Sequence, residues 1–274
     1  MKSNSPSKIS LVVSDVDGTL IDQNKKLTDR TKAAVQKLRD AGILFTVTSA
    51  RPPFGLKAIA DSLKLQYPIG SFNGGVISSP DGKLIDRIPL DSATIPEIIA
   101  TIESYSLDIW LYSDRHWYLK DPKGFHVDHH RDTIQFEPTA IESYDDIEEE
   151  IIKIIAASSD FEGVAQCTTT LQKKFENSLS ATRSQAYNLD ITHPRANKGN
   201  AVKQIAQHLN IPIAETITIG DSYNDIEMFA ISEASIAMGN ADLEVQQKAT
   251  YVTSDHADEG FANAIERFVL KQSA

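Results

Sequence analysis

The chain has 274 residues, of which 41% are hydrophobic and 24% charged, and its formal net charge is −11. This size and composition allow a sizeable buried core in one large domain or two smaller ones. The acidic balance disfavours contact with phosphate backbones or anionic lipid, so we expect neither nucleic acid nor a membrane as a partner.

The start of the chain and its cysteine content predict a cytoplasmic protein. The segment MKSNSPSKIS is polar, residues 9–13 are too short for the apolar core of a signal peptide, and no apolar run reaches the length of a membrane span. The single cysteine, Cys167, cannot form an internal disulfide and has no CxxC neighbour. We interpret it as a packed apolar side chain.

The first part of the chain has the pattern strand, helix, strand. Residues 9–14 are apolar and β-branched and end in Asp-Val-Asp-Gly, which is typical of a buried strand entering a turn. Residues 28–41 carry apolar side chains at helical spacing, with Thr28 as N-cap and Gly42 at the left-handed C-terminal position. The run ILFTVTSAR is a second strand ending at Ser49. This order predicts a βαβ unit of a parallel sheet.

The last part repeats this rhythm. We expect helices over residues 201–209, 225–231 and 260–270, and strands over 216–219, 235–238 and 251–254. Both ends of the chain together predict an α/β fold, a doubly wound parallel sheet of the Rossmann-like kind.

The middle of the chain has a different pattern. Helical spacing occurs at residues 93–105 and 145–157, separated by aromatic, alternating stretches such as residues 108–120. Such alternation is typical of antiparallel strands with one solvent-facing side. We predict an α+β insert over residues 83–189 within a core formed by residues 1–82 and 190–274.

Polar residues follow several predicted core strands: Asp15, Asp17, Ser49, Asn73 and Asp221. Ligands of open parallel sheets bind beyond the carboxyl ends of the strands, so these side chains should converge. Carboxylates brought together repel one another unless a cation lies among them, and an all-oxygen set suits Mg²⁺. The pattern therefore predicts a magnesium site that leaves positions for substrate oxygens.

A lysine completes the predicted site. Lys198 lies at the start of a helix, where its ammonium, the backbone N–H groups and the helix dipole can neutralise a phosphoryl group.

The motifs DVDGTL, SAR, NGG, NKGNAV and GDSYNDIEM occur in this order over nearly the whole chain. Their order and spacing resemble those of the haloacid dehalogenase-like hydrolases, and more narrowly the Cof-type sugar-phosphatase branch, in which a cap domain is inserted between the second and third motifs. DxDGT together with GDxxND is a specific signal, whereas SAR or NGG alone would be weak.

The resemblance implies a nucleophile and a proton carrier. Asp15 would take the phosphoryl group as an aspartyl-phosphate. Asp17 would protonate the leaving alcohol, deprotonate the attacking water and offer its backbone carbonyl to the metal. Gly18 would allow the sharp turn, and Thr19 would orient Asp17.

The resemblance also implies the groups that hold phosphate. Ser49 would donate its hydroxyl to the phosphoryl oxygens, helped by the N–H groups of Val16 and Ala50, and Lys198 would balance the developing charge. Asn73 would either contact the substrate or only form a turn.

The fourth motif supplies the remaining metal groups by the same resemblance. Asp221 would ligate Mg²⁺, Asp225 would support or join it, and Ser222 and Asn224 would lie against metal or phosphate. The chain departs from the family pattern in having Ser49-Ala50 for the usual Thr-Gly and Ser222 for a frequent glycine. Both changes keep small side chains, and Ser49 keeps the hydroxyl.

Other conspicuous residues have structural interpretations. We expect Arg51 to steady the loop after the second strand rather than to face the substrate. The segment FHVDHHRD, with three histidines, is predicted to be a polar loop rather than a metal site. A final set of aromatic residues is assigned to core packing rather than to ligand stacking: Trp110, Tyr112, Trp117 and Tyr118.

These observations predict a Mg²⁺-dependent phosphatase of small phosphorylated metabolites, monomeric or homodimeric, whose insert selects the substrate. Two alternatives remain, a phosphomutase of the same superfamily and a catalytically silent binding or regulatory relative.

Overall fold

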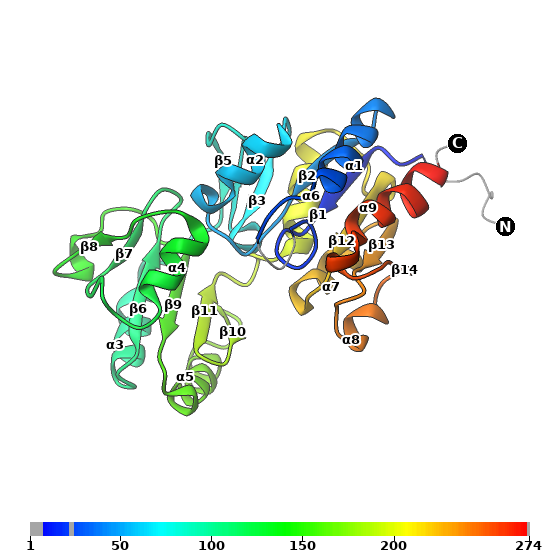
Figure 1. Ribbon diagram of the computed structural model, residues 1–274. Coiled ribbons are helices and arrows are strands. Elements are labelled where there is room, and N and C mark those ends of the chain that lie inside the picture. The colour runs from blue at the N-terminus through cyan, green and yellow to red at the C-terminus, as the bar shows by residue number, and fades with distance from the viewer. Residues whose placement is uncertain (1–7, 22–24, 273–274) are drawn as a thin grey trace.

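The computed structural model describes residues 8–21 and 25–272, so the predicted absence of a signal peptide core rests partly on residues outside the described range. The chain folds into a core and a second lobe, which holds its own sheet and helices (Figure 1). No helix within the described ranges combines the length and apolar composition needed to cross a bilayer.

The core contains a five-stranded parallel sheet in the order β14-β13-β12-β1-β2. Strand β1 is central: Val12 aligns with Ile217 of β12 on one side and with Phe45 of β2 on the other. The predicted strands and their parallel arrangement are confirmed. The strands are β1 (Leu11–Ser14), β2 (Leu44–Val47), β12 (Thr216–Gly220), β13 (Ala234–Ala237) and β14 (Tyr251–Val252).

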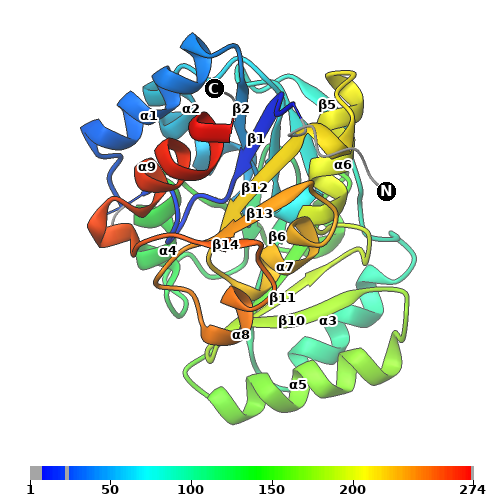
Figure 2. The same cartoon turned by 90° about the vertical axis from the view of Figure 1, so that its right-hand side faces the viewer.

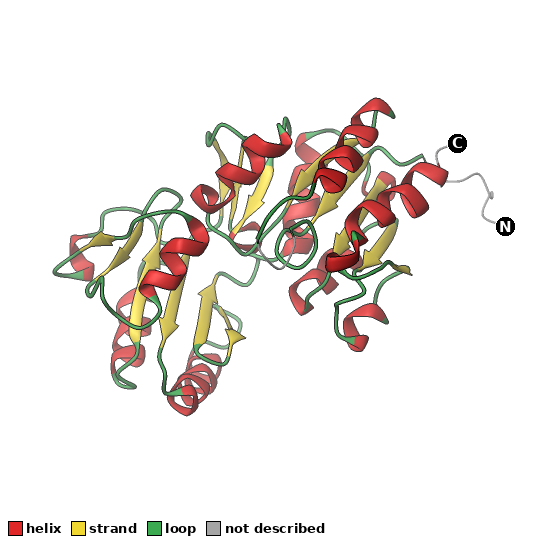
Figure 3. Cartoon of the chain, in the orientation of Figure 1, coloured by secondary structure: helices red, strands yellow, loops and turns green. Residues whose placement is uncertain are grey.

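Helices cover both faces of this sheet (Figure 3). On one face, α1, α2 and the C-terminal helix pack with Val12 and Ile217 of the sheet, and on the other α6, α7 and α8 pack with Leu11 and Val13. The doubly wound α/β fold is therefore confirmed. The core helices are α1 (Asp29–Asp40), α2 (Lys57–Leu63), α6 (Lys198–His208), α7 (Ile226–Phe229), α8 (Leu243–Gln246) and α9 (Gly260–Ala264).

Local signals set the ends of α1. The Thr28 side chain accepts a hydrogen bond from the Thr31 N–H, and Gly42 has a φ of +72° just beyond the helix. Both predictions are confirmed, because a hydroxyl satisfies a free helix N–H and glycine adopts positive φ without strain.

The closing helix is confirmed but irregular. It continues from α9 as a π turn over Ile265–Val269 and a 3-10 turn over Leu270–Gln272. Glu266 accepts hydrogen bonds from Lys37 at 2.7 Å and Arg30 at 3.1 Å, which ties this helix to α1.

A small antiparallel sheet leads from the core to the second lobe. It contains β3 (Ile69–Ser71), β4 (Val76–Ser78) and β5 (Leu84–Arg87), and Thr48 pairs with Gly70 beside β2. The Ile88 N–H still donates to Gly75, whereas the Leu90 N–H donates to Ile151 of the second lobe. We propose from these pairings that the insert begins between residues 88 and 90 and ends after β11, a few residues later at each end than the predicted 83–189.

The second lobe is built on a six-stranded sheet in the order β10-β11-β9-β6-β7-β8. Helices α3 and α5 pack on one face of this sheet. Its strands are β6 (Asp108–Tyr112), β7 (Trp117–Leu119), β8 (Thr139–Ala140), β9 (Lys153–Ala157), β10 (Ser180–Gln185) and β11 (Asn188–Thr192). Its helices are α3 (Ile95–Glu103), α4 (Val127–Ile134) and α5 (Phe161–Lys174).

The helix predicted over residues 145–157 is wrong. Only residues 144–146 form a short 3-10 turn, and Lys153–Ala157 is β9, which lies between β6 and β11. Every residue of β9 is buried: Ile154 and Ala156 pack with α3 and α5, and Ile155 and Ala157 pack in the aromatic cluster on the other face. A continuous apolar run rich in isoleucine is typical of such a strand. The prediction was wrong because the acidic residues before this run resemble the first turn of a helix.

The antiparallel strands predicted over residues 108–120 are confirmed as β6 and β7, but their solvent-facing side is not. Trp110, Tyr112 and Trp117 are at most 3% exposed. They pack with Val127 of α4 and with Phe72 of the core, so core packing of these aromatic residues is confirmed.

The histidine-rich segment is a helix rather than a polar loop. It forms most of α4, and His130 packs against Trp110 and accepts or donates a hydrogen bond with the Tyr112 hydroxyl at 2.8 Å. Cys167 is buried among apolar side chains of α5, as predicted.

Candidate active site

The carboxyl ends of the core strands point toward the second lobe (Figure 2), and several predicted site residues follow these strand ends. Asp15 directly follows β1, Ser49 comes shortly after β2, and Asp221 directly follows β12. Lys198 is the first residue of α6, whose N-cap Asn197 accepts a hydrogen bond from the Asn200 N–H.

Lys198 lies between two carboxylates. Its Nζ is 2.5 Å from Oδ1 of Asp15 and 2.5 Å from Oδ1 of Asp225, and the lysine side chain is 1% exposed. Burial alone would lower the pKa of Lys198, but the charges of Asp15 and Asp225 outweigh it and raise the pKa. Lys198 is therefore a fixed positive charge beside Asp15.

One lysine does not balance the acids around it. One carboxylate oxygen from each of Asp15, Asp221 and Asp225 lies within 4.8 Å of the other two. Burial, opposed by Lys198 and reinforced by both other carboxylates, raises the pKa of Asp15 well above its ordinary value. Burial and the charge of Asp225 likewise raise the pKa of Asp221 to about 6.

These residues fit a hard divalent cation. The cluster offers only oxygen ligands, and its excess negative charge is the condition that Mg²⁺ relieves. Asn224 beside it has a buried side-chain oxygen without a partner in the described part of the chain. The cluster could therefore hold the predicted cation.

Asp225 also shapes the loop that carries Asp221. Its Oδ2 accepts hydrogen bonds from the N–H groups of Asp221 and Ser222, both at 2.9 Å. A Cβ at Gly220 would lie 2.3 Å from the Asp225 carboxyl carbon, so only glycine fits the approach. Asp225 thus both neutralises Lys198 and orients the preceding loop.

Sequence reasoning missed one residue of this group and misplaced another. Thr19, expected to orient Asp17, instead donates its hydroxyl to Oδ1 of Asp221 at 3.1 Å. Asn240 was not predicted; its side-chain amide donates to Oδ2 of Asp221 at 3.3 Å and to the Gly18 carbonyl at 3.0 Å. An Asn after a predicted core strand was the available signal.

Asp17 faces a different environment from Asp15. Arg51 donates to both of its oxygens, through Nε at 2.7 Å and Nη2 at 2.8 Å, and Lys25 donates at 2.9 Å. Burial would raise the pKa of Asp17, but the hydrogen bonds and charges of Arg51 and Lys25 lower it. Asp15 and Asp17 are separated by a single residue, yet their pKa values are shifted in opposite directions.

Ser49 and Asn73 belong to two loops that are joined through the backbone. The Asn73 N–H donates to the Ser49 carbonyl at 2.8 Å, and the Phe72 N–H donates to the Arg51 carbonyl at 2.9 Å. Phe72 and Asn73 have φ values of +50° and +55°, a strained turn that these bonds hold in place. The Asn73 side chain accepts from Asn224 at 3.1 Å, so it reaches the fourth motif.

A cleft of about 410 Å³ opens beside these residues, between the core and the second lobe. Its core side includes Ala50, Asn73, Lys198, Ser222 and Asn224, whereas its other side comes from β9, β10 and β11. The other predicted site residues are not part of this lining: Asp15, Val16, Ser49 and Asp225, which are buried, and Asp17 and Asp221, which are partly buried.

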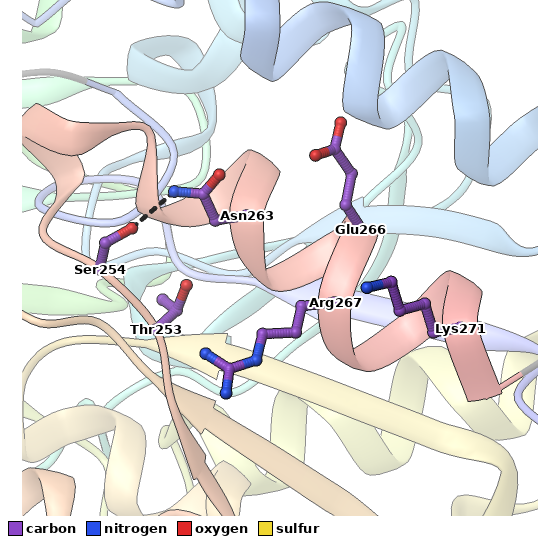
Figure 4. Close-up of a pocket in the computed structure, with 6 residues that line it drawn as sticks. All are labelled: Thr253, Ser254, Asn263, Glu266, Arg267 and Lys271. Carbon is purple, nitrogen blue, oxygen red and sulfur yellow. Dashed lines mark hydrogen bonds between the residues drawn. The ribbon is translucent and has the colours of Figure 1, made fainter.

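Another hollow, of about 480 Å³, lies at the C-terminal helix (Figure 4). Its residues include Ser254, Asn263 and Glu266, with Asn263 donating to Ser254 at 2.7 Å. Glu266 is already paired with Arg30 and Lys37, and none of the predicted site residues lines this hollow. The cleft beside Lys198 is therefore the candidate active site.

Comparisons with known proteins agree with the fold. Residues 12–265 match the model of the haloacid dehalogenase-like hydrolase family, so the chain belongs to that family. It is an enzyme of the phosphatase class, since relatives that match almost the whole chain are named as phosphatases or putative phosphatases.

Two curated relatives are similar over almost their whole length. A putative phosphatase of Haemophilus influenzae is 27% identical, covering 93% of this chain and 96% of the relative. The 5-amino-6-(5-phospho-D-ribitylamino)uracil phosphatase YwtE of Bacillus subtilis is 29% identical, covering 95% and 98%.

Solved structures share the fold. The crystal structure of a haloacid dehalogenase-like hydrolase from Bacteroides thetaiotaomicron has a TM-score of 0.88 at 24% identity, covering 95% of this chain and 99% of the other. A HAD subclass IIB sugar phosphatase has a TM-score of 0.82 at 19% identity, covering 94% and 98%.

Proposed function

We propose that the protein is a Mg²⁺-dependent phosphatase of small phosphorylated metabolites, of the Cof-type branch, and that the second lobe is its cap. The observation that carries the proposal is the position of Lys198, which lies between Asp15 and Asp225 and lines a cleft of substrate size. Location in the cytoplasm and a monomeric or homodimeric state remain predictions.

Asp15 is the proposed nucleophile. One of its carboxylate oxygens forms a bond to phosphorus while the bond from phosphorus to the leaving alcohol oxygen breaks. Lys198 holds Asp15 in place and stabilises negative charge on the transferring group. Water then forms a bond to phosphorus, the Asp15–phosphorus bond breaks, and inorganic phosphate leaves.

Asp17 is the proposed proton carrier. It gives a proton to the leaving oxygen in the first step and takes one from the attacking water in the second. Because Arg51 and Lys25 lower its pKa, a bound phosphomonoester must weaken these contacts or supply the proton as the substrate monoanion. Arg51 is thus part of the site rather than only a support of its loop.

The remaining groups hold the substrate phosphate and the cation. Ser49, with the N–H groups of Val16 and Ala50, would bind phosphoryl oxygens. Asp15, Asp221, Asp225 and the Asp17 carbonyl would hold Mg²⁺, with Ser222 and Asn224 beside it. When bound, the cation supplies charge stabilisation to the phosphoryl oxygens.

Replacement of the nucleophile tests the proposal. Asp15→Asn should lower the hydrolysis of para-nitrophenyl phosphate by about 10³-fold or more, since covalent transfer has no other acceptor. Asp29→Asn makes the same chemical change on the exposed surface of α1 and should leave the rate unaltered. Equal rates for the parent and Asp15→Asn would refute the assignment.

Release of inorganic phosphate separates a phosphatase from a phosphomutase. The parent should release one phosphate for each monoester consumed. Isomerisation without phosphate release would identify a mutase, and absence of both would identify a binding protein.

A further inference from the structure

On the face toward the core, one half of the cap sheet is apolar and the other half is polar. On the face toward the core, Trp110 and Tyr112 of β6 are buried under α4. Along the same face, Tyr112 aligns with Lys153 of β9, which aligns with Thr192 of β11. No cap helix covers this polar half within the described chain, and it lines the cleft.

Residues 180–182 of β10 and 189–192 of β11 alternate between the two faces of the sheet. A register shift follows Arg183, and Arg183 and Ser184 also line the cleft. Ala181, Leu189 and Ile191 point to α5 and the apolar cap core. The residues between them, Ser180, Thr182, Asp190 and Thr192, line the cleft. Neighbouring strand residues point to opposite faces, so this polar set forms one wall opposite Lys198.

A buried ion pair lies within that wall. Lys153 Nζ is 3.0 Å from Asp190 Oδ2, and the two side chains are 8% and 13% exposed. Asn188 donates to the other oxygen of Asp190 at 3.2 Å, which fixes the carboxylate. Removing two charges from water is unfavourable, and an apolar pair of similar volume would be at least as stable, so stability alone does not account for this pair.

We infer that Lys153 and Asp190 are specificity-determining residues that bind the hydroxyl groups of a polyhydroxylated aliphatic leaving group. This inference rests on the proposed phosphatase function and specifies its substrate class. An ammonium beside a carboxylate offers donors and acceptors to neighbouring hydroxyls, and Thr182 adds a hydroxyl on the next strand. A purely aliphatic chain would displace water from these charged groups and offer them no hydrogen bond in return, so the site discriminates against it.

The wall also disfavours a flat heterocycle as the primary ligand. Two aromatic residues, Phe72 and Tyr223, line the cleft, both from the core, and Phe72 packs edge-on against Tyr112 at 5.6 Å. The cap side of the cleft has no aromatic ring among its described lining residues and offers hydroxyl, ammonium, guanidinium and carboxylate groups instead, the guanidinium from Arg183. An alditol monophosphate fits this chemistry, with its phosphate at Lys198 and its hydroxyls at Asp190.

A matched substrate pair tests the inference. D-Ribitol 5-phosphate and n-pentyl phosphate have the same chain length, and only the first carries hydroxyls. The parent should prefer ribitol 5-phosphate by about tenfold or more in kcat/KM, the effect of hydrogen bonds to charged groups. Asp190→Asn and Thr182→Val should reduce this preference, mainly through KM.

Controls separate recognition from folding. Lys174→Ala breaks an exposed cap ion pair with Glu97 on the far side of the sheet and should keep the preference. Thr182 is exposed, so Thr182→Val should fold even if Asp190→Asn does not. A parent that hydrolyses both substrates equally, or variants that lose both rates in proportion, would overturn the inference.

Binding separates this inference from the proposed function. In an Asp15→Asn background, calorimetry should show tighter binding of ribitol 5-phosphate than of n-pentyl phosphate, and Asp190→Asn should remove the difference. If the parent hydrolysed no phosphomonoester, the proposed function would fail, and this binding comparison would still decide the role of Asp190.

Discussion

Arg51 donates two parallel hydrogen bonds to Asp17, from Nε to Oδ2 at 2.7 Å and from Nη2 to Oδ1 at 2.8 Å. The planar guanidinium matches the carboxylate and fixes its rotation as well as its position. Arg51 is only 12% exposed, so the pair is partly removed from solvent. We therefore expect Arg51 to act as a positioning residue for the proposed proton carrier.

Arg51→Met should reduce hydrolysis of n-pentyl phosphate by about tenfold or more, because a displaced acid protonates the alkoxide poorly. Para-nitrophenolate leaves without a proton, so hydrolysis of para-nitrophenyl phosphate should fall less. Steady-state rates with both substrates measure the contrast. Arg51→Lys keeps the positive charge but not the planar pair of N–H donors, so it should restore only part of the lost rate. Equal losses of rate with both substrates would argue against a positioning role for Arg51.

Gly18→Ala should disrupt the position of Asp221. Gly18 has a φ of +81°, and an added Cβ would lie 2.3 Å from Oδ2 of Asp221. Gly42 has a φ of +72° with nothing within 4 Å, so Gly42→Ala carries the same backbone strain without the clash. The positive φ alone should lower the unfolding free energy of each variant by about 1 kcal/mol, and the clash should add to the loss in Gly18→Ala. Only Gly18→Ala should also lose phosphatase activity, and similar activities of the two variants would contradict the role of the close approach.

Removal of the cation should be visible in stability as well as in activity. EDTA should abolish hydrolysis, and added Mg²⁺ should restore it. Mg²⁺ at a hundredfold excess over its Kd should stabilise the fold by about 2.7 kcal/mol, because it binds only the assembled carboxylates. Thermal unfolding measures this shift, and Asp221→Asn should lose most of it. An equal shift in both proteins would place the cation elsewhere.

His130 should make the fold sensitive to acid. Burial, with the nearby charge of Lys153, lowers the pKa of His130 to about 3 from its ordinary 6.5. Below pH 6.5, His130 binds a proton in the unfolded chain but stays neutral in the folded chain. The contribution of His130 to stability is therefore complete above pH 6.5. It should fall by about 1.4 kcal/mol per pH unit as the pH drops toward 3.

His130→Gln keeps a partner for the Tyr112 hydroxyl and removes the titration. Denaturant unfolding of parent and variant between pH 4 and 7 should show a shallower pH dependence for the variant. Parallel curves would show that His130 does not titrate differently in the folded chain.

Strong local sequence patterns were sufficient to predict the strands and helices of the core. The β1 run, the capped helix α1 and the strand at β12 follow from periodicity and turn residues, which act over a few residues. The insert was harder, since residues 145–157 carry both a helical acidic start and a strand-like isoleucine run. The choice depends on β6 and β11, which bury β9 on both sides and lie far from it in sequence.

The sequence by itself determined which residues gather at one edge of the core sheet. Asp15, Ser49, Lys198 and Asp221 follow core strands or begin a helix, and parallel strands bring their carboxyl ends to one edge. Only the tertiary structure decided which side chains pair: Thr19 with Asp221, Arg51 with Asp17, and Lys153 with Asp190. Such pairs form between segments that are distant in the chain, so they depend on how the lobes and loops pack. No periodic pattern in the sequence indicates which residues will pair.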